Sequence, residues 1–133
     1  MTKRLVTSFI LAALGALACL PAAQARMSNE QQMLELSPET RLEQRCNARA
    51  MGAVGREHKE FRPDEIVAYA FADPQIHGNS IKATGAAVRS RGKWFRMSYT
   101  CQTSTDGLAI EAFAYSLGAE VPKPEWAEHS LVP

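Results

Sequence analysis

Apolar residues recur at helical spacing in the first half of the chain and at strand spacing in the second half. Between residues 37 and 57 the main apolar positions lie four residues apart: Leu42, Cys46, Ala50 and Val54. This spacing puts them on one side of an α-helix. Ser37 and Pro38 are residue types favoured at the N-cap and at the first helical position, so the helix is predicted to begin there.

From Ile66 onward, apolar and polar residues alternate, which is typical of β-strands. Four strands are predicted, separated by turn-forming residues: 66–71, 80–90, 93–103 and 108–117. Gly85 is a candidate bulge within the second strand. The composition of the fourth segment also suits a helix, but its aromatic residues alternate, which favours a strand.

One helix followed by four strands with short connections predicts a simple topology. Short connections join neighbouring antiparallel strands, so the strands should form a meander. The sheet has an apolar face and the helix has an apolar side, and each must be buried against another layer. The predicted fold class is therefore α+β, with an N-terminal helix packed on a four-stranded antiparallel meander sheet.

The third strand predicts which side of the sheet the helix covers. Its alternation assigns one set of residues to the core: Phe95, Met97, Tyr99 and Cys101. The opposite side receives Trp94, Arg96, Ser98, Thr100 and Gln102. In the outer strands the residues assigned to the core are Val67, Tyr69, Phe71, Phe113 and Tyr115. Ile66, Ala68 and Ala70 form an equally apolar alternative face, because a shift of one residue exchanges the two sides of a strand.

Residues 1–25 have the pattern of a secretory signal peptide. A basic start precedes an apolar run from Leu5 to Leu20, and Ala23 and Ala25 are small residues at the positions that a signal peptidase reads. Cleavage is expected between Ala25 and Arg26, which leaves residues 26–133 as a single domain. The expected location of this mature chain is the periplasm.

Two alternatives to cleavage at Ala25 remain open. The first is a retained membrane anchor, for which the apolar run is short. The second is a lipid anchor on Cys19, although Ala16 and Leu17 are not the residues that usually precede a lipidated cysteine. The remaining sequence contains no second apolar span, so no transmembrane segment is expected in the mature chain.

The charge of the mature chain bears on its partners. It keeps 13 Lys and Arg, which is 15 less Lys3 and Arg4, against 14 Asp and Glu, so its formal net charge is −1. Nucleic-acid binding requires a strongly basic surface, so nucleic acid is not expected as a partner.

Two cysteines remain after cleavage, Cys46 and Cys101. A pair of cysteines in an exported chain is typical of a disulfide. Cys46 lies on the apolar side of the predicted helix and Cys101 on the core side of the third strand, so the two face each other. The bond would close a loop of about 55 residues, which is worth about 4 kcal/mol by chain entropy. Neither a Cys-x-x-Cys redox motif nor four zinc ligands can be assembled from the sequence.

The residue types of catalytic sites are present but scattered. The histidines, His58, His77 and His129, lie in separate polar segments and are expected to be exposed. Asp64, Glu65 and Asp73 lie near the ends of the first strand, where acidic residues beside prolines usually form turns and caps. The sequence has no Gly-rich phosphate loop and no serine elbow. No catalytic residue, cofactor or metal site is therefore assigned.

Basic residues are concentrated around the hairpin between the second and third strands. The candidate interaction patch consists of Lys82, Arg89, Arg91, Lys93, Trp94 and Arg96. Such a surface suits an anionic envelope component or an envelope protein as the partner. The alternative is a solvated hairpin whose charges prevent edge-to-edge aggregation.

The preferred function is a non-enzymatic binding module for an envelope component or a protein partner. A small, hydrolase-like envelope enzyme that uses the acidic residues or a histidine is the first alternative. The second is an inhibitor of an envelope enzyme that acts through the loop of residues 73–79.

Three segments resemble the family called domain of unknown function 930, which consists of small exported proteins of Gram-negative bacteria. The segments are "SPETRLEQRC", "RPDEIVAYAFADPQIHGNSIKATGAAVRSRGKWFRMSYTC" and "LGAEVPKPEW". The resemblance covers roughly residues 37 to 126. It implies that Cys46 and Cys101 occupy the two cysteine positions of the family, and that the "SRGKW" hairpin belongs to the family pattern. It implies no activity or catalytic residue.

Overall fold

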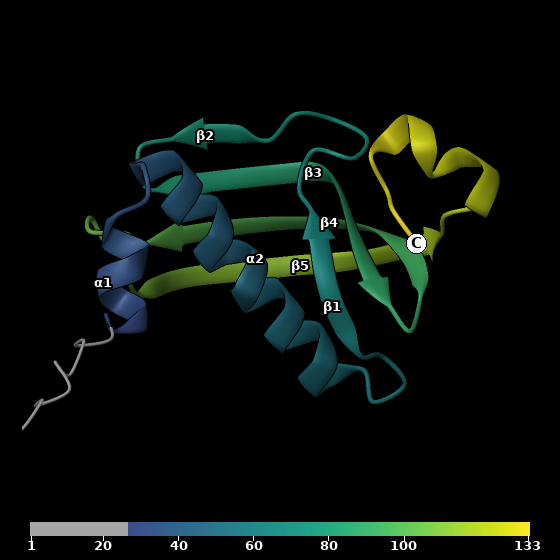
Figure 1. Cartoon of the computed structure of the whole chain (residues 1–133), viewed down its shortest axis with the longest axis horizontal. Helices are drawn as coiled ribbons and strands as arrows, with labels where there is room; N and C mark the ends of the chain where they lie inside the picture. The colour runs from purple at the N-terminus through teal and green to yellow at the C-terminus, as the bar shows by residue number, and fades with distance from the viewer. Residues whose placement is uncertain (1–26) are drawn as a thin grey trace, which may run out of the picture.

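The computed structural model describes residues 27–133 (Figure 1). The predicted signal peptide, the cleavage site between Ala25 and Arg26, and Cys19 lie outside the described residues. The elements follow in the order α1 (Asn29–Leu34), α2 (Pro38–Glu57), β1 (Pro63–Val67), β2 (Gln75–His77), β3 (Ser80–Ser90), β4 (Lys93–Thr103), β5 (Ile110–Glu120), and the short 3₁₀ helices η1 (Lys123–Glu125) and η2 (Ala127–His129). From residue 27 to the C-terminus, no helix is long and apolar enough to cross a membrane.

The strands form one antiparallel sheet in the order β1-β3-β4-β5, and α2 lies across one of its faces (Figure 1). Strand β2 pairs with the beginning of β3, whereas β1 pairs with the end of β3. This is the predicted α+β fold class, with the helix preceding the sheet. The short strand β2 was not predicted, and it lies within the segment of residues 73–79 that was expected to be a loop.

The first strand differs from its prediction. It was predicted over residues 66–71, but β1 ends at Val67 and the chain then turns away. The cause lies in β3, where the register shifts between Ala83 and Ala86. Here the Phe71 amide donates to the Gly85 carbonyl at 2.8 Å, and a Cβ on Gly85 would lie 2.3 Å from the Ala72 nitrogen. Gly85 is therefore at a bulge, as predicted, because the chain after β1 crosses directly over it.

Helix α2 begins where the sequence predicts. The Ser37 hydroxyl accepts a hydrogen bond from the Thr40 amide, and Pro38 is the first helical residue. The buried side of the helix packs on the sheet and consists of Leu42, Cys46, Ala50, Ala53 and Val54.

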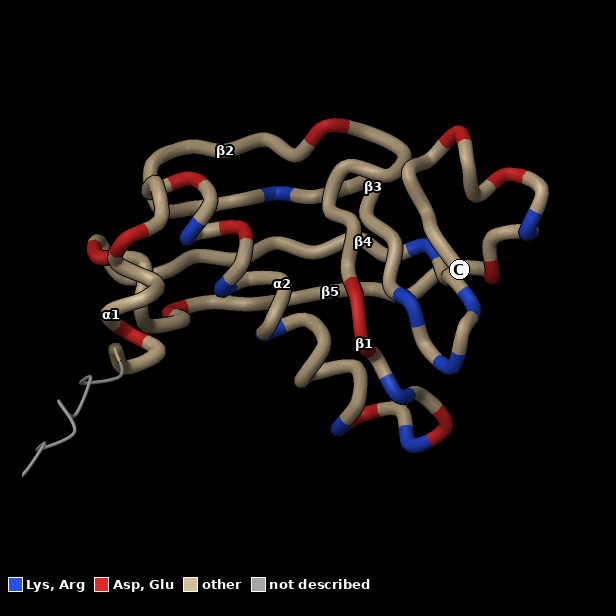
Figure 2. The backbone as a smooth tube through the Cα atoms, viewed as in Figure 1, with Lys and Arg blue, Asp and Glu red and all other residues tan. Residues whose placement is uncertain are grey.

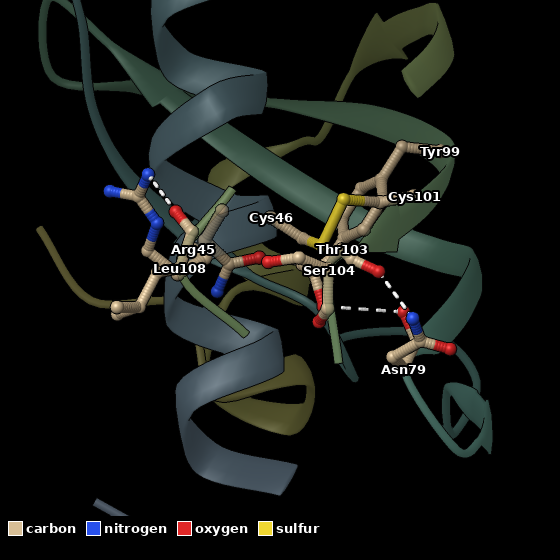
Figure 3. Close-up of a disulfide and its surroundings, with 9 residues drawn as sticks. Arg45, Cys46, Asn79, Tyr99, Cys101, Thr103, Ser104 and Leu108 are labelled. Carbon is tan, nitrogen blue, oxygen red and sulfur yellow. Dashed lines mark hydrogen bonds between the residues drawn. A yellow bond between two sulfur atoms is a disulfide. The ribbon is translucent and has the colours of Figure 1, made fainter. Parts of the chain in front are cut away.

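The disulfide between Cys46 and Cys101 joins α2 to β4 with a Cα–Cα distance of 6.0 Å (Figure 3). Met97, Tyr99 and Cys101 are buried in this helix-side core, with Phe95 packed at its border, as the alternation predicted. Phe113 and Tyr115 of β5 also pack against it.

The core assignments in β1 and the turn after it were wrong. Ile66 and Ala68, not Val67, belong to the helix-side core. Val67 and Phe71 contribute to a second cluster, and Tyr69 is 52 % exposed. The alternative face was correct for Ile66 and Ala68, because β1 joins the sheet in a register that pairs Ile66 with Val88, but Ala70 belongs to the second cluster.

A second apolar cluster lies on the sheet face away from α2. Its buried members are Val67, Ala70, Ala87, Trp94, Val121, Trp126 and Leu131. The C-terminal segment of residues 121–133 covers this end of the sheet, at the end of the chain that is yellow in Figure 1. Trp94 is 0 % exposed, and its indole Nε1 donates to the Val132 carbonyl at 2.7 Å.

Candidate functional site

The basic residues predicted as one patch do not form one free surface. Lys82 pairs with Thr100, whereas the turn of the β3–β4 hairpin follows Ser90. Lys82 is therefore roughly 25 Å along the strand from the turn. Trp94, which was predicted to be on the surface, is completely buried. An aromatic residue beside a hairpin was interpreted as exposed, but here the C-terminal segment folds over it.

Arg89 is occupied by two carboxylates. Its Nε lies 2.8 Å from an Asp64 oxygen and its Nη1 lies 3.0 Å from a Glu65 oxygen. The hydrogen bond to Asp64 raises the pKa of Arg89, and the charges of Asp64 and Glu65 act in the same direction. Figure 2 shows these acidic positions of β1 beside the basic positions of the hairpin. This pairing neutralises the centre of the predicted patch.

The remaining basic residues of the hairpin also have partners. The Arg91 Nε donates to the Glu60 carbonyl at 3.0 Å, and Lys93 lies 3.4 Å from Glu120. The Arg96 guanidinium lies 3.7 Å from the centre of the Phe71 ring. Arg91 and Gly92 both have positive φ, at 51° and 74°, as the tight two-residue turn requires. The basic side chains of the hairpin are therefore engaged in local contacts within the protein.

The structure does not bring the histidines together. His58 packs against the rings of Phe61 and Tyr115, and His77 lies in β2. The His129 ring packs against Phe71 in a tilted arrangement, with centroids 4.0 Å apart. Within residues 27–133, no group of three or more His, Cys, Asp or Glu side chains is arranged to hold a metal ion.

The acidic candidates are divided between two places. Asp64 and Glu65 form the ion pairs with Arg89, and Asp73 lies in the loop between β1 and β2. The acidic residues of β1 therefore act as ion-pair partners of Arg89 in β3.

A different surface is open on the sheet face away from α2. The alternation of β3, β4 and β5 directs small and polar side chains to it, and the C-terminal segment covers the hairpin end. The side chains on the open part are Gln75, His77, Lys82, Thr84, Ser98, Thr100, Gln102, Ala112, Ala114 and Ser116. We call this surface the open face.

Three adjoining hollows on the open face form one groove that follows the length of β3, β4 and β5. The first has a volume of about 270 Å³ and lies beside β2, where Gln75 and Gln102 contribute to it. The second, about 280 Å³, shares Lys82 and Thr100 with the first. The third, about 180 Å³, shares Ser98 with the second and reaches the stacked pair of Phe71 and Arg96.

The polar groups of the groove are arranged for hydrogen bonding. The hydroxyls of Ser98 and Ser116 lie 2.8 Å apart across β4 and β5. Lys82 is exposed, and no carboxylate in the described chain lies within ion-pair distance of it. Hydroxyls donate and accept hydrogen bonds, whereas the lysine ammonium only donates. The groove therefore combines neutral hydrogen-bonding groups with the cation of Lys82, and the Arg96 guanidinium lies over Phe71 in its third hollow.

Two tyrosines connect the sheet to α2 beneath this groove. The Tyr99 hydroxyl donates to Asn47 at 2.7 Å, and the Tyr115 hydroxyl donates to Glu57 at 2.7 Å. Desolvation raises the pKa of Tyr99 well above its usual value. Desolvation and the hydrogen bond to Glu57 raise the pKa of Tyr115 to about 12. Both hydroxyls therefore stay protonated at neutral pH and hold the helix on the sheet.

The end of the groove beside β2 rests on the disulfide. Thr100 and Gln102 point to the open face, and Cys101 between them points to α2. The Asn79 side-chain amide donates to the Thr103 carbonyl, which connects the turn after β2 to the end of β4 (Figure 3). The alternation of β4 already indicated that Ser98, Thr100 and Gln102 face away from the helix, but it could not indicate where the C-terminal segment stops covering that face.

Comparison with known proteins places the chain in a family. Residues 33–131 match the family described as Domain of Unknown Function (DUF930). The match begins in the last turn of α1 and ends two residues after η2. No curated protein and no solved structure matches the chain. The matched segment includes α2, all the strands, Cys46 and Cys101, and the chain belongs to the DUF930 family.

Proposed function

We propose that this protein is an exported binding module of the bacterial envelope, and that the groove on the open face is its ligand-binding surface. The observation that carries the proposal is the lining of the groove, in which neutral hydrogen-bonding side chains surround the cation of Lys82. The disulfide supports export, because such bonds persist in oxidising compartments.

The chemistry of the lining favours a hydroxyl-rich polymer that carries carboxylates. Thr84, Ser98 and Thr100 offer hydroxyls that exchange hydrogen bonds with sugar hydroxyls. The Lys82 ammonium complements a carboxylate with a charge-assisted hydrogen bond. Peptidoglycan is an envelope polymer with this combination of groups, and it is the ligand that we propose.

The shape of the groove favours binding of a chain. The three hollows are shallow and continuous, and they follow one another along the strands. Sites for small molecules are usually concave enough to enclose most of the ligand. A shallow groove of this kind instead suits a polymer that lies along it.

Co-sedimentation with purified peptidoglycan sacculi tests the proposal. The wild-type protein is expected to sediment with the sacculi, and Lys82→Gln is expected to weaken binding about tenfold, because it removes one charged hydrogen bond. Lys59→Gln is the matched control, since Lys59 is exposed in the loop after α2. Thr100→Val should also weaken binding, because it removes a hydroxyl while preserving the side-chain shape.

A double variant with Arg91→Ser and Lys93→Ser tests the hairpin as the alternative surface. Normal sedimentation of the double variant with the sacculi, together with weakened sedimentation of Lys82→Gln, supports the groove as the binding surface. If the double variant no longer sediments with the sacculi and Lys82→Gln binds as the wild-type protein does, the binding surface is the hairpin and the proposal is overturned. Absence of wild-type binding to sacculi would exclude peptidoglycan as the ligand.

A further inference from the structure

Strand β5 is a long outer strand whose free edge has no partner in the described chain. It has 11 residues, whereas β1 at the other edge has five. Between residues 27 and 133, no hydrogen bond from a turn, loop or side chain reaches the backbone of β5. Alternate residues of the free edge of an antiparallel strand present their N–H and C=O groups outward.

The side chains of β5 do not protect this edge. Native edge strands usually carry charges, proline or a covering element that prevents pairing with another chain. The stretch of residues 112–119 contains no charged residue and no proline. None of the residues of β5 is buried, although Phe113, Tyr115 and Leu117 are large and face the helix side. Strand β5 is therefore built like an inner strand but lies at the edge.

We infer that β5 pairs antiparallel with β5 of a second copy of this chain, with Tyr115 on the two-fold axis. In an isologous pair the same surface meets itself, so the sequence of the strand must be compatible with its own reverse. The register of β5 against β4 is regular from Ala112 to Leu117, so this stretch is a suitable template for a further strand.

The inferred register makes β5 complementary to itself. Centring the pair on Tyr115 places Phe113 opposite Leu117 on the helix side and Ala114 opposite Ser116 on the open face. Aromatic and aliphatic residues that face each other across strands stabilise the pair. The side chains that are only half-buried in one copy would then be covered by the same side chains of the other copy.

The charges at the ends of β5 disfavour one neighbouring register. With Tyr115 on the axis, the uncharged residues 112–118 pair with one another, and Glu111 and Glu120 lie outside them. A shift that sets Tyr115 opposite Ser116 would bring Glu111 against Glu120, and like charges directly opposite are destabilising. That shift would also put the helices of the two copies on opposite faces of the sheet.

The inferred dimer has a consequence for the open face. Residues opposite each other in an antiparallel pair point to the same side of the sheet. Ala112, Ala114 and Ser116 of the two copies would therefore form one continuous surface, with a groove on each side of the axis. The inference rests on the edge of β5 and not on the ligand of the groove.

Sedimentation equilibrium of the purified protein with its disulfide intact tests the inference. The wild-type protein is expected to show a monomer–dimer equilibrium. Ala114→Lys is expected to weaken the dimer roughly tenfold, because it places two like charges near the axis. Ala48→Lys is the matched control, since Ala48 is exposed on α2. A wild-type protein that stays monomeric at all concentrations, or a dimer unaffected by Ala114→Lys, would overturn the inference.

Cysteine crosslinking tests the register separately. Tyr115→Cys should form an intermolecular disulfide on mild oxidation, because directly opposite Cβ atoms are about 5 Å apart. Phe113→Cys should not crosslink to itself, because the two copies of this position would lie about 13 Å apart along the strands. Crosslinking of Phe113→Cys without crosslinking of Tyr115→Cys would overturn the register. Circular dichroism of both variants checks that they are folded.

Discussion

The two ends of β4 are anchored on opposite faces of the sheet. Near the start of the strand, Trp94 is buried on the face away from α2, under the C-terminal segment. Near the end of the strand, Cys101 is bonded to Cys46 on the face toward α2. The face away from α2 is therefore covered at the first end and open at the second. The residues at the open end are held in position from beneath.

This difference shows why clustered charge is a poor guide to a binding surface in this protein. The hairpin end is rich in basic residues, yet Arg89 pairs with two carboxylates and Lys93 with Glu120. At the other end, Lys82 points to the open face and is free of any ion pair among residues 27–133. The availability of a cation to a ligand depends on its partners more than on the number of cations nearby.

Breaking the anchor at the hairpin end should have the largest effect. Trp94→Ala is expected to reduce the free energy of unfolding by about 3–5 kcal/mol, because it leaves a cavity under the C-terminal segment. Urea denaturation measures the change. Thr100→Ala, in the same strand at the exposed end, is the control and should change stability little. Equal stability of the two variants would mean that the second cluster does not hold the C-terminal segment.

Breaking the anchor at the open end should have the next largest effect. Replacing both Cys46 and Cys101 with Ala is expected to reduce the free energy of unfolding by about 2–4 kcal/mol, because the bond restricts a long loop in the unfolded chain. Hydrogen exchange should become faster near Thr100 and Gln102 than near Trp94. Uniform acceleration along β4 would contradict the assignment of separate anchors to its two ends.

The basic residues at the two ends should differ in their effect on stability. Arg89→Ser is expected to lower stability by less than the loss of either anchor, because its ion pairs with Asp64 and Glu65 are at the surface. Lys82→Ser should leave the urea midpoint unchanged. A larger loss of stability for Lys82→Ser than for Arg89→Ser would indicate that Lys82 has a structural partner.

The smallest effect should appear at high pH. The pKa of Tyr115 is raised to about 12 in the folded protein, against about 10 in an unfolded chain. A raised folded-state pKa means that the contribution to stability is complete below pH 10 and is lost as the pH rises toward 12. Tyr115→Phe should reduce this loss. Urea midpoints and phenolate absorbance measured through this pH range test it, and identical pH profiles would contradict the hydrogen bond to Glu57.

Much of the fold was predictable because its signals are local. The start of α2 follows from the residue types Ser37 and Pro38, and the bounds of β3 and β4 follow from alternation and from the two-residue turn between them. The disulfide was predictable because both cysteines lie on apolar sides of their elements. In β1 the two faces are equally apolar, so the pattern did not distinguish Val67 from Ile66.

The sequence by itself determined the order of α2 and the four main strands, the fold class, the cysteine pair and the side of β4 on which each residue lies. Only the tertiary structure decided what covers each side. Alternation depends on the backbone geometry of one strand, whereas coverage depends on segments far away along the chain. The segment of residues 121–133 is short and irregular, yet its position buries Trp94 and leaves Thr100 open. For that reason the candidate site is the open face, although the sequence had predicted the basic hairpin.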